Sequence, residues 1–507
     1  MMSKTLRGGR LDSKRDDVAE FTSSIKNDAR LASAVIDINK AHVVMLLEQK
    51  IIKPQDAAKL LKTLSGKLEL KLDSASEDIH MAVEEAVLQQ TGAEVGGNMH
   101  VGKSRNDQVA TAIRMELRRE LINLMNAVLE TQKSILETAG KNVERIILSY
   151  THMQPAQPVT FAHYLLARFD QLSRSLQRLQ NAYKTVNQCP LGAGALATTS
   201  FPINRERTAE LLGFDGLAEN SMDAVGSRDF ILETLAALTI TAIDMSQFAE
   251  DLLLWSSLDY GVIELPDEFT STSSMMPQKK NAEVAEVIRA RTSNVLGDFV
   301  AAASALKAMP STYNLDFQEI TPKLWDAVET VQQSLTILSR LVPNLKVCPD
   351  AVKKAETSFV AATELANMLV RKYAIPFRSA HRIVGAVVKK LVVANQTLKE
   401  ATPELLQKIA KETTGITVMV KATDVTEAVD IKTIVSSHSV TGGPAPATVK
   451  QALAARRKQM DRSKSDATKL HQRLEIAQKG LENLTKLISE GKISNSGRFK
   501  NSERMVE

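Results

Sequence analysis

A serine-rich loop followed by lysines and a helix is the segment best suited to chemistry. Residues 270–286 read TSTSSMMPQKKNAEVAE and contain Ser273, Lys279 and Asn281. A serine hydroxyl accepts a proton only where positive charge or hydrogen-bond donors stabilise the alkoxide, because its pKa lies far above neutral. Lys279 and the N-terminus of the following helix can supply both. The alternative is an exposed polar turn that only caps the helix.

A second polar segment is suited to binding carboxylates. Residues 96–114 read GGNMHVGKSRNDQVATAIR, in which glycines form a turn and Ser104, Arg105 and Asn106 lead into a long helix. A guanidinium pairs with a carboxylate through two hydrogen bonds, and an amide adds a further donor. The alternative is a helix-capping loop with a solvated arginine.

A third segment places a histidine beside a proline-rich turn. Residues 150–158 read YTHMQPAQP and include His152. The imidazole of a histidine can transfer protons near neutral pH. A carboxylate such as Glu286, if it reached His152, would orient the ring and favour its charged form. A purely structural histidine is the alternative.

Long helices must position these segments. Proline is absent from residues 106–154, and an apolar stripe from Ile113 to Ile135 predicts a helix of about 30 residues there. Residues 230–255 are apolar on nearly every side, which predicts a helix enclosed by a bundle or by other subunits. A third helix is predicted from about residue 281 to about residue 306. Strand signals are weak, and residues 416–420 (ITVMV) are one of the few.

These patterns divide the chain into four parts. We predict an N-terminal helical domain (residues 1–108), a central long-helix bundle (109–360), a C-terminal helical domain (361–455) and a basic tail (456–507). The tail carries leucines at helical spacing: Leu470, Leu474, Leu481 and Leu484. It is expected to form a peripheral amphipathic helix with a frayed end and no catalytic role. Nucleic-acid binding by this basic tail is an alternative addition.

Composition excludes several classes of protein. The chain has 507 residues with 64 basic and 59 acidic side chains, and the net charge of +5 is too small to indicate a nucleic-acid-binding protein. The 2 cysteines, Cys189 and Cys348, form no CxxC pattern, so a disulfide framework or a zinc site is not expected. The polar N-terminus lacks a signal-peptide core and no apolar run is long enough to span a membrane. A cytoplasmic protein is expected.

Several segments together carry a resemblance to a known family. They are, in chain order, GGNMHVGKSRNDQVAT, YTHMQPAQP, LGAGALATTSFPI, LGFDGLAENSMDAV, SRDF, ELPDEFTS, SSMMPQKKN, STYNLDFQE and VTGGPAP. This order resembles that of argininosuccinate lyase, and the likeness covers about residues 8–455. The pattern SSxMPxKxN is shared by the wider fumarase/aspartase superfamily and indicates only the class of reaction. SRNDQVAT, MPQKKN and STYNLDFQE point more narrowly to argininosuccinate lyase.

The resemblance implies an all-α fold of three domains, in which the central long helices form the multi-helix core of a homotetramer. It implies active sites that combine segments from three subunits. The implied reaction is the reversible elimination of fumarate from argininosuccinate to give arginine, a reaction of arginine biosynthesis. No metal and no organic cofactor is implied.

The resemblance also implies roles for individual residues. Ser273 resembles the catalytic base, Lys279 and Asn281 resemble groups that stabilise developing charge, and His152 paired with Glu286 resembles a supporting pair. The residues that resemble contacts to the succinyl part are Ser104, Arg105, Asn106 and Thr151. Those that resemble contacts to the arginine end are Tyr313 and Gln318. A weaker N-terminal pattern adds Ser24, Asp28, Asp78 and His80 to the binding residues.

Some positions depart from the family pattern. Thr272 stands where glycine is usual, which is expected to stiffen the serine loop. Ala282 replaces a usual proline and Lys103 a usual arginine. Thr321 stands where many members carry a lysine that is thought to bind the amino-acid carboxylate, and Lys323 is a candidate substitute. If neither contact exists, the arginine end lacks this partner, whereas the residues of the elimination are unchanged.

Two other functions are compatible with these residues. A related lyase, such as adenylosuccinate lyase or a fumarase-like enzyme, would use the same three segments. A non-catalytic structural protein of the same fold would tolerate losses at Ser273, Lys279, Asn281, His152 or Glu286, but all five are present. The sequence therefore favours an enzyme.

Overall fold

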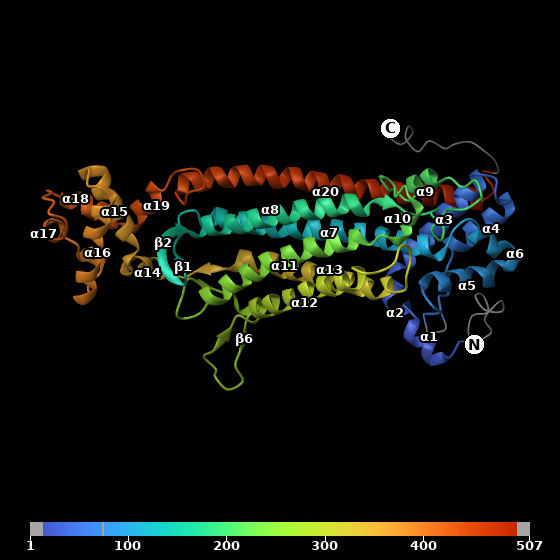
Figure 1. Ribbon diagram of the computed structural model, residues 1–507, viewed down its shortest axis with the longest axis horizontal. Helices are drawn as coiled ribbons and strands as arrows, with labels where there is room; N and C mark the ends of the chain where they lie inside the picture. Colours follow the sequence, from blue (N-terminus) through green and yellow to red (C-terminus); the bar gives the residue numbers. More distant parts are fainter. Residues whose placement is uncertain (1–13, 73–75, 494–507) are drawn as a thin grey trace.

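Five long helices form the centre of an elongated molecule, which the computed structural model describes for residues 14–72 and 76–493 (Figure 1). They are α7 (Arg105–Lys141), α8 (Phe161–Val186), α11 (Asp229–Trp255), α12 (Glu283–Leu306) and α13 (Phe317–Leu341). The three helices expected from the sequence, now α7, α11 and α12, are therefore confirmed. The all-α fold class is confirmed with them.

The apolar stripe of α7 explains why this helix is central. Ile113, Leu117, Leu121, Leu124 and Val128 are all buried in the main core. Because they recur at helical spacing, one face of α7 enters the core along its length. On α11 nearly the whole circumference is apolar, and the chain still leaves Ile240 and Ile243 substantially exposed.

The N-terminal part covers one end of the bundle (Figure 1). Its helices are α1 (Asp16–Thr22), α2 (Ile25–Asp28), η1 (Ala29–Leu31), α3 (Ala32–Glu48), α4 (Pro54–Ser65), α5 (Ile79–Thr91), α6 (Ala93–Gly96) and η2 (Gly97–His100). Two short helices, α9 (Arg205–Leu211) and α10 (Ser221–Gly226), lie in the long connection that joins α8 to α11. The buried side chains of α9 belong to the same core as those of the bundle, whereas Ala224 and Val225 of α10 pack with Ala193 in a small separate cluster.

A small helical domain with a core of its own lies at the opposite end. It comprises α14 (Ala351–Thr357), η5 (Phe359–Ala361), α15 (Ala362–Tyr373), α16 (Phe377–Val393), η6 (Leu398–Glu400), α17 (Pro403–Thr414), α18 (Ala422–Val429) and α19 (Ile431–Ser437). The strand expected at residues 416–420 is wrong, since this segment is irregular. Val420 is buried in the domain core and Met419 is exposed, but no neighbouring strand accepts a ladder of hydrogen bonds.

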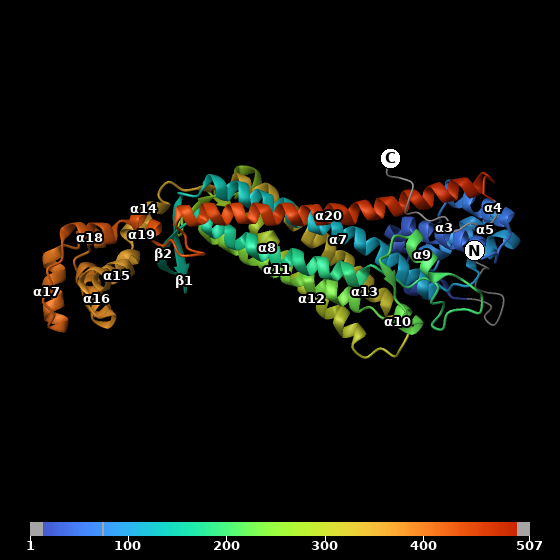
Figure 2. The same ribbon diagram turned by 90° about the horizontal axis from the view of Figure 1, so that it is seen from above.

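The C-terminal helix α20 (Pro446–Ser489) links the two ends of the molecule (Figure 2). It packs along α7 and α8 and then against α3 and α4. Arg456 pairs with Asp170 of α8 at 2.5 Å, and Leu481, Leu484 and Ile488 are buried. The sequence suggested a boundary between the C-terminal domain and the tail at residues 455 and 456. Helix α20 runs through these two residues without a break. The frayed end expected beyond it falls largely on residues 494–507, which lie outside the described residues.

Short strand pairs connect the helices. They are β1 (Ile146–Thr151) with β2 (Gln154–Thr160), β3 (Gln188–Cys189) with β4 (Gly216–Leu217), β5 (Ile263–Glu264) with β8 (Lys346–Val347), and β6 (Ser271–Thr272) with β7 (Lys280–Asn281). Two further turns of 3-10 helix are η3 (Asp267–Phe269) and η4 (Val342–Asn344). The pairs β1–β2 and β6–β7 are hairpins, and they carry the histidine and serine segments.

Candidate active site

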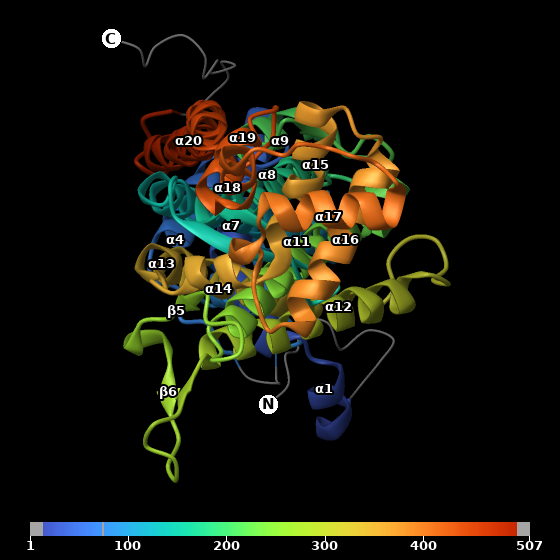
Figure 3. The same cartoon turned by 90° about the vertical axis from the view of Figure 1, so that its left-hand side faces the viewer.

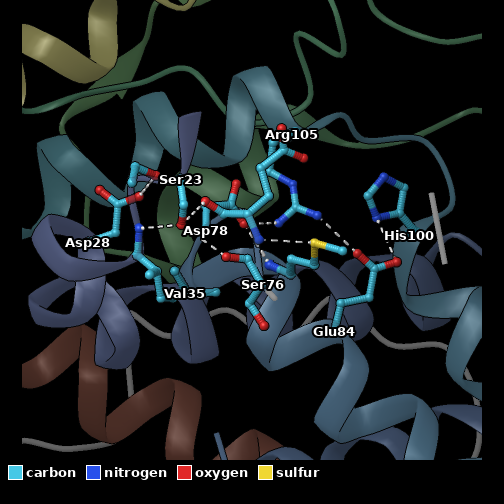
Figure 4. Close-up of polar contacts among 12 residues, drawn as sticks. Ser23, Asp28, Val35, Ser76, Asp78, Glu84, His100 and Arg105 are labelled. Atoms are coloured by element: carbon cyan, nitrogen blue, oxygen red, sulfur yellow. Dashed lines mark hydrogen bonds and ion pairs between the residues drawn. The ribbon is translucent and has the colours of Figure 1, made fainter. Parts of the chain in front are cut away.

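The carboxylate-binding segment forms the start of α7. Ser104 is the N-cap, its backbone N–H donates to the Asp107 carboxylate at 2.9 Å, and the two residues form a capping box. Arg105 is not a solvated arginine, because it donates to Asp78 at 2.8 Å and to Glu84 at 3.2 Å (Figure 4). Asn106 donates to the Ala195 carbonyl at 3.1 Å. Residues 104–106 therefore cap α7, and the same residues are the ones predicted to bind carboxylates.

Two carboxylates lie next to this segment, of which Asp78 is buried and Asp28 is half-buried. The Ser24 hydroxyl hydrogen-bonds to Asp28, and burial raises the pKa of Asp28 to about 6. Asp78 caps α5 by accepting from the Met81 N–H at 2.7 Å, and burial raises its pKa although Arg105 opposes the shift. Both carboxylates therefore carry a charge that is poorly solvated in the free protein.

His80 follows on α5 and is buried. Neither of its ring nitrogens has a hydrogen-bond partner within the described chain. Burial lowers its pKa well below the ordinary value, and the neighbouring Arg105 and Lys103 lower it further. The His80 imidazole is therefore neutral. The four residues of the weaker N-terminal pattern, Ser24, Asp28, Asp78 and His80, all lie in this part of the structure.

The loop before α13 brings the predicted arginine-end residues to the same place. Tyr313 is half-buried, burial raises the pKa of its hydroxyl, and Gln318, Arg228, Asp28 and Asp78 are near enough to influence that pKa. Thr321 is buried, and its hydroxyl donates to the Phe317 carbonyl of its own helix at 3.0 Å. A hydroxyl used in this way is not offered to a ligand.

Lys323, the candidate substitute for Thr321, points elsewhere. Its ammonium lies 3.8 Å from Asp298 on α12. Two positions along a helix differ by about 200° in direction, so Lys323 and Thr321 face opposite sides of α13. The substitution that the sequence suggested therefore has no support within this chain.

The serine segment is a hairpin that projects from the bundle (Figure 3). Its strands β6 and β7 pair Thr272 with Lys280, so the threonine that replaces glycine sits in extended backbone. The Ser273 Oγ accepts from the backbone N–H groups of Met275 at 3.3 Å and Met276 at 3.1 Å. Two donors aimed at one hydroxyl oxygen are the kind of group that stabilises an alkoxide. Both the catalytic interpretation of this loop and an exposed polar turn are compatible with these contacts.

The two consecutive lysines of this hairpin have different surroundings. Lys280 donates to Asp267 at 2.6 Å and to Glu264 at 3.2 Å, which secures the base of the hairpin. Lys279 is exposed and has no ion pair within the described part of the chain. Asn281 lies 3.5 Å from the Ser271 hydroxyl. Lys279 is therefore available to a ligand that approaches the hairpin.

The histidine segment forms the turn of the β1–β2 hairpin. His152 and Met153 occupy the turn with φ of 53° and 62°, as a two-residue hairpin turn requires. Thr151 and His152 are exposed at the tip. Glu286 is exposed in the first turn of α12, and no contact joins it to His152 within the described residues.

The three segments do not meet within one chain. Helix α7 has 37 residues and is about 55 Å long, and it separates Arg105 from the hairpin that carries His152. In the described ranges no hydrogen bond or ion pair joins the Ser273 hairpin to either of the other two segments. Within one chain the structure brings together the residues around Arg105 at the start of α7. The hairpins that carry His152 and Ser273 remain exposed.

Two contributing residues were missed by sequence reasoning. Asp107 also accepts from the N–H groups of Gly192 and Gly194, each at 2.9 Å, and so ties the loop after α8 to the start of α7. Its spacing from Ser104 is a capping-box signal that could have indicated it. Arg228 is buried with its guanidinium 4.1 Å from the Phe317 ring centre. Arg228 stands directly before the apolar helix α11, and no sequence pattern there indicates a role for it in the site.

Replacing Asp28 by asparagine is expected to stabilise the free protein while weakening substrate binding. Because the folded protein holds the Asp28 proton more tightly than the unfolded chain, stability falls as pH rises from about 4 to about 6. Above that range the cost of the ionised carboxylate is about 3 kcal/mol, and asparagine removes it. Thermal unfolding at pH 8 should show a more stable variant, with the difference vanishing near pH 4.

The kinetic half of this prediction is a KM about tenfold higher for a cationic substrate. Asp424 provides a matched control, because its half-buried carboxylate has a lowered pKa owing to Lys372 and Tyr373. Asp424→Asn should give no stabilisation at pH 8. An Asp28→Asn protein that melted below wild type at pH 8 would contradict the prediction.

Within the described ranges, no group of three or more His, Cys, Asp or Glu side chains is placed to hold a metal ion. Over the same ranges, no helix combines the length and apolar character needed to cross a membrane.

Known proteins resemble this chain along most of its length. A family model described as Lyase matches residues 9–297, and one described as Argininosuccinate lyase C-terminal matches residues 359–436. Argininosuccinate lyase of Methanocaldococcus jannaschii is 43% identical over 476 residues, covering 92% of this chain and 97% of that protein. Argininosuccinate lyase of Methanosarcina barkeri is 41% identical over 497 residues, covering 96% and 99%.

Solved structures share the fold. EDDS lyase in complex with formate superposes with a TM-score of 0.84 at 30% identity, over 93% of this chain and 96% of that one. The class II fumarase of Schistosoma mansoni superposes with a TM-score of 0.64 at 15% identity, over 79% and 90%, and this likeness concerns the fold alone. The fold and the matched lyase model define a lyase of the fumarase/aspartase superfamily. Within it, this chain belongs to the argininosuccinate lyase family.

Proposed function

We propose that this protein cleaves argininosuccinate into fumarate and arginine, and catalyses the reverse addition. The main support for this proposal is that groups of opposite charge lie together at the start of α7. Arg105, held by Asp78 and Glu84, and Asn106, held by the Ala195 carbonyl, are positioned donors for carboxylates, while Asp28 and Asp78 near Tyr313 suit a cation. Argininosuccinate has two carboxylates on its succinyl part, and its arginine part carries a cationic guanidinium and ammonium besides one carboxylate. A fumarase substrate has no such cation.

Ser273 is the base in the mechanism that we propose. It removes the proton next to a carboxylate of the succinyl part, which places a second negative charge on that carboxylate. Fixed donors must stabilise this charge, and Lys279 and Asn281 of the same hairpin suit the task. One such donor is typically worth about 3 kcal/mol. The C–N bond then breaks, the electrons of that bond leave with the guanidino nitrogen, and a general acid or water supplies the proton that this nitrogen takes up as arginine departs.

The two backbone amides at the Ser273 oxygen make this proton transfer feasible. The N–H groups of Met275 and Met276 already point at the Oγ, so the alkoxide needs little reorganisation to be stabilised. Closure of the projecting hairpin over bound substrate would exclude water and strengthen these interactions.

We further propose a homotetramer whose active sites combine the three segments from different subunits. Its support is the separation of the segments within one chain and the apolar surface left on the bundle. Val287, Leu296 and Val300 on α12 are 44%, 47% and 53% exposed. A chain that leaves such residues on neighbouring helices in water is expected to bury them against further copies. In that assembly His152 would pair with Glu286 of another subunit, and Thr151 would join the binding residues.

One observation favours a second candidate function. Because Thr321 is bonded to its own helix and Lys323 faces Asp298, the contact expected for the amino-acid carboxylate of arginine is missing. A lyase that acts on a different N-substituted aspartate would not need that contact. EDDS lyase, whose structure this chain resembles at 30% identity, is a lyase of another specificity.

The decisive assay follows fumarate absorbance with purified protein. Argininosuccinate, adenylosuccinate and EDDS are offered separately, and hydration is tested by offering fumarate alone. Release of fumarate from argininosuccinate at the highest kcat/KM supports the proposal. Preference for another N-substituted aspartate supports the second candidate. Failure with every compound, by protein of the expected oligomeric mass, would support the structural alternative.

Recognition of the arginine end is expected to depend on Tyr313 and not on Lys323. Tyr313→Phe should raise the KM for argininosuccinate about tenfold, the effect of losing one hydrogen bond to a charged group. Lys323→Met is the matched test and should leave KM nearly unchanged, because this side chain is directed at Asp298. A larger rise of KM in Lys323→Met than in Tyr313→Phe would show that Lys323 takes the place of the missing lysine.

A further inference from the structure

A lysine lies buried directly beneath the carboxylate-binding segment. Lys103 is 7% exposed, and it stands between Gly102, whose φ is 72°, and Ser104 at the cap of α7. Its ammonium donates to the Asn39 side-chain oxygen on α3. The Asn39 amide is held in this orientation because its nitrogen donates to the Val35 carbonyl at 2.9 Å. Lys103 thus anchors the turn before Ser104 to α3.

Charged and titratable groups surround this ammonium on every packed element. They are His42 on α3, His80 and Glu84 on α5, His100 in η2, and Arg105 and Asp107 on α7. The His42 imidazole is neutral, since burial and Lys103 lower its pKa to about 3. Burial also lowers the pKa of His100, against the pull of Glu84. The ammonium is therefore opposed by Arg105 and supported by the carboxylates of Asp107 and Glu84.

Asp107 connects Lys103 to the binding segment. Its carboxylate accepts from the backbone of Ser104, Gly192 and Gly194, and a charged carboxylate accepts such bonds far better than a neutral one. Burial raises the pKa of Asp107 to about 6, and Lys103 is among the groups that oppose this rise. The cation thus favours the ionised Asp107 that fixes the position of Ser104.

We propose that Lys103 is a positioning residue for the binding of substrate carboxylates. While protonated, its ammonium holds the turn before Ser104 against Asn39 and attracts the ionised Asp107, so that the Ser104–Asn106 segment stays fastened to α3 and to the loop at residues 192–195. When it loses its proton, that fastening weakens and affinity for the dianionic succinyl part falls. The inference rests on the proposed function and names the group that makes substrate binding sensitive to pH. Burial lowers the pKa of Lys103 to about 7, which places the transition near neutrality.

The test compares wild type with Lys103→Arg and Lys103→Met between pH 6 and pH 10. In wild type, KM for argininosuccinate should rise with pH up to about tenfold per pH unit, the limit for loss of one proton, while kcat changes little. Lys103→Arg should abolish this rise, because a guanidinium stays protonated throughout the range. Lys103→Met should have a high KM at every pH and a kcat/KM about 100-fold lower, as expected for a misplacement of about 1 Å.

A KM profile that is the same in wild type and Lys103→Arg would overturn the proposal, whether or not Lys103→Met folds. If wild-type protein does not cleave argininosuccinate at any pH, the proposed function fails instead. Thermal unfolding then tests Lys103 directly. Because its folded pKa lies below the unfolded value of about 10.4, wild type should gain stability relative to Lys103→Arg as pH rises above 7. If the free energies of unfolding of wild type and Lys103→Arg changed in parallel with pH, the role assigned to Lys103 would be wrong.

Discussion

Ser273→Ala is expected to lower kcat for fumarate release by about 10³-fold, within the range of about 10²–10⁴ that a general base contributes. The substrate proton is weakly acidic, so its removal requires a base held in contact with it. The Ser273 oxygen is the group toward which the backbone amides of Met275 and Met276 are directed, and alanine offers nothing in its place. Fumarate absorbance under saturating argininosuccinate gives kcat directly.

Ser274→Ala is the matched control for this measurement. Ser274 is exposed and adjacent in the same loop, so its replacement changes local polarity by the same amount. It should retain most of the wild-type kcat, and its free energy of unfolding should lie within about 0.5 kcal/mol of that of wild type, as is usual for exposed positions. If Ser273→Ala kept more than about a tenth of the activity, the base would be another group. His152 would then be the first candidate.

Two inactive variants are expected to restore activity when their subunits are mixed. Ser273→Ala removes the base, and Asn106→Asp replaces a donor by a carboxylate that repels the substrate. If each site draws these residues from different subunits, random mixing leaves about one quarter of the sites with both residues intact. Co-expression with two affinity tags, followed by purification on both, gives the mixed oligomers to assay.

The control pair for this experiment is Ser273→Ala with Lys279→Met. Both residues belong to the same projecting hairpin, so every hairpin in the mixture is defective and activity should stay at the level of the single variants. Light scattering should give about four times the chain mass of 55.5 kDa. Mixed oligomers of Ser273→Ala and Asn106→Asp that remain inactive would show that one chain builds the whole site.

The helices of the bundle could be read from local pattern alone. The stripe from Ile113 to Val128 repeats at the helical period, residues 230–255 are apolar on nearly every side without a proline, and a helix satisfies its backbone within itself. The capping box of Ser104 is likewise local. Strand pairs depend on a partner elsewhere, so the β1–β2 hairpin was missed and residues 416–420 were wrongly expected to be a strand.

The residues of the candidate site were identifiable by type, but their surroundings were not. The sequence by itself determined which hydroxyl, guanidinium, amide and lysine stand in the loops, and it determined the long helices that carry them. Only the tertiary structure placed Asp28 and Asp78 beside Tyr313, buried Lys103 against Asn39, and separated Ser273 from Arg105. Burial and distance between segments remote in sequence arise from packing, and a pKa responds to both of them. The pKa values of Asp28, Asp78 and Lys103 are therefore set by the folded structure and could not be read from the sequence.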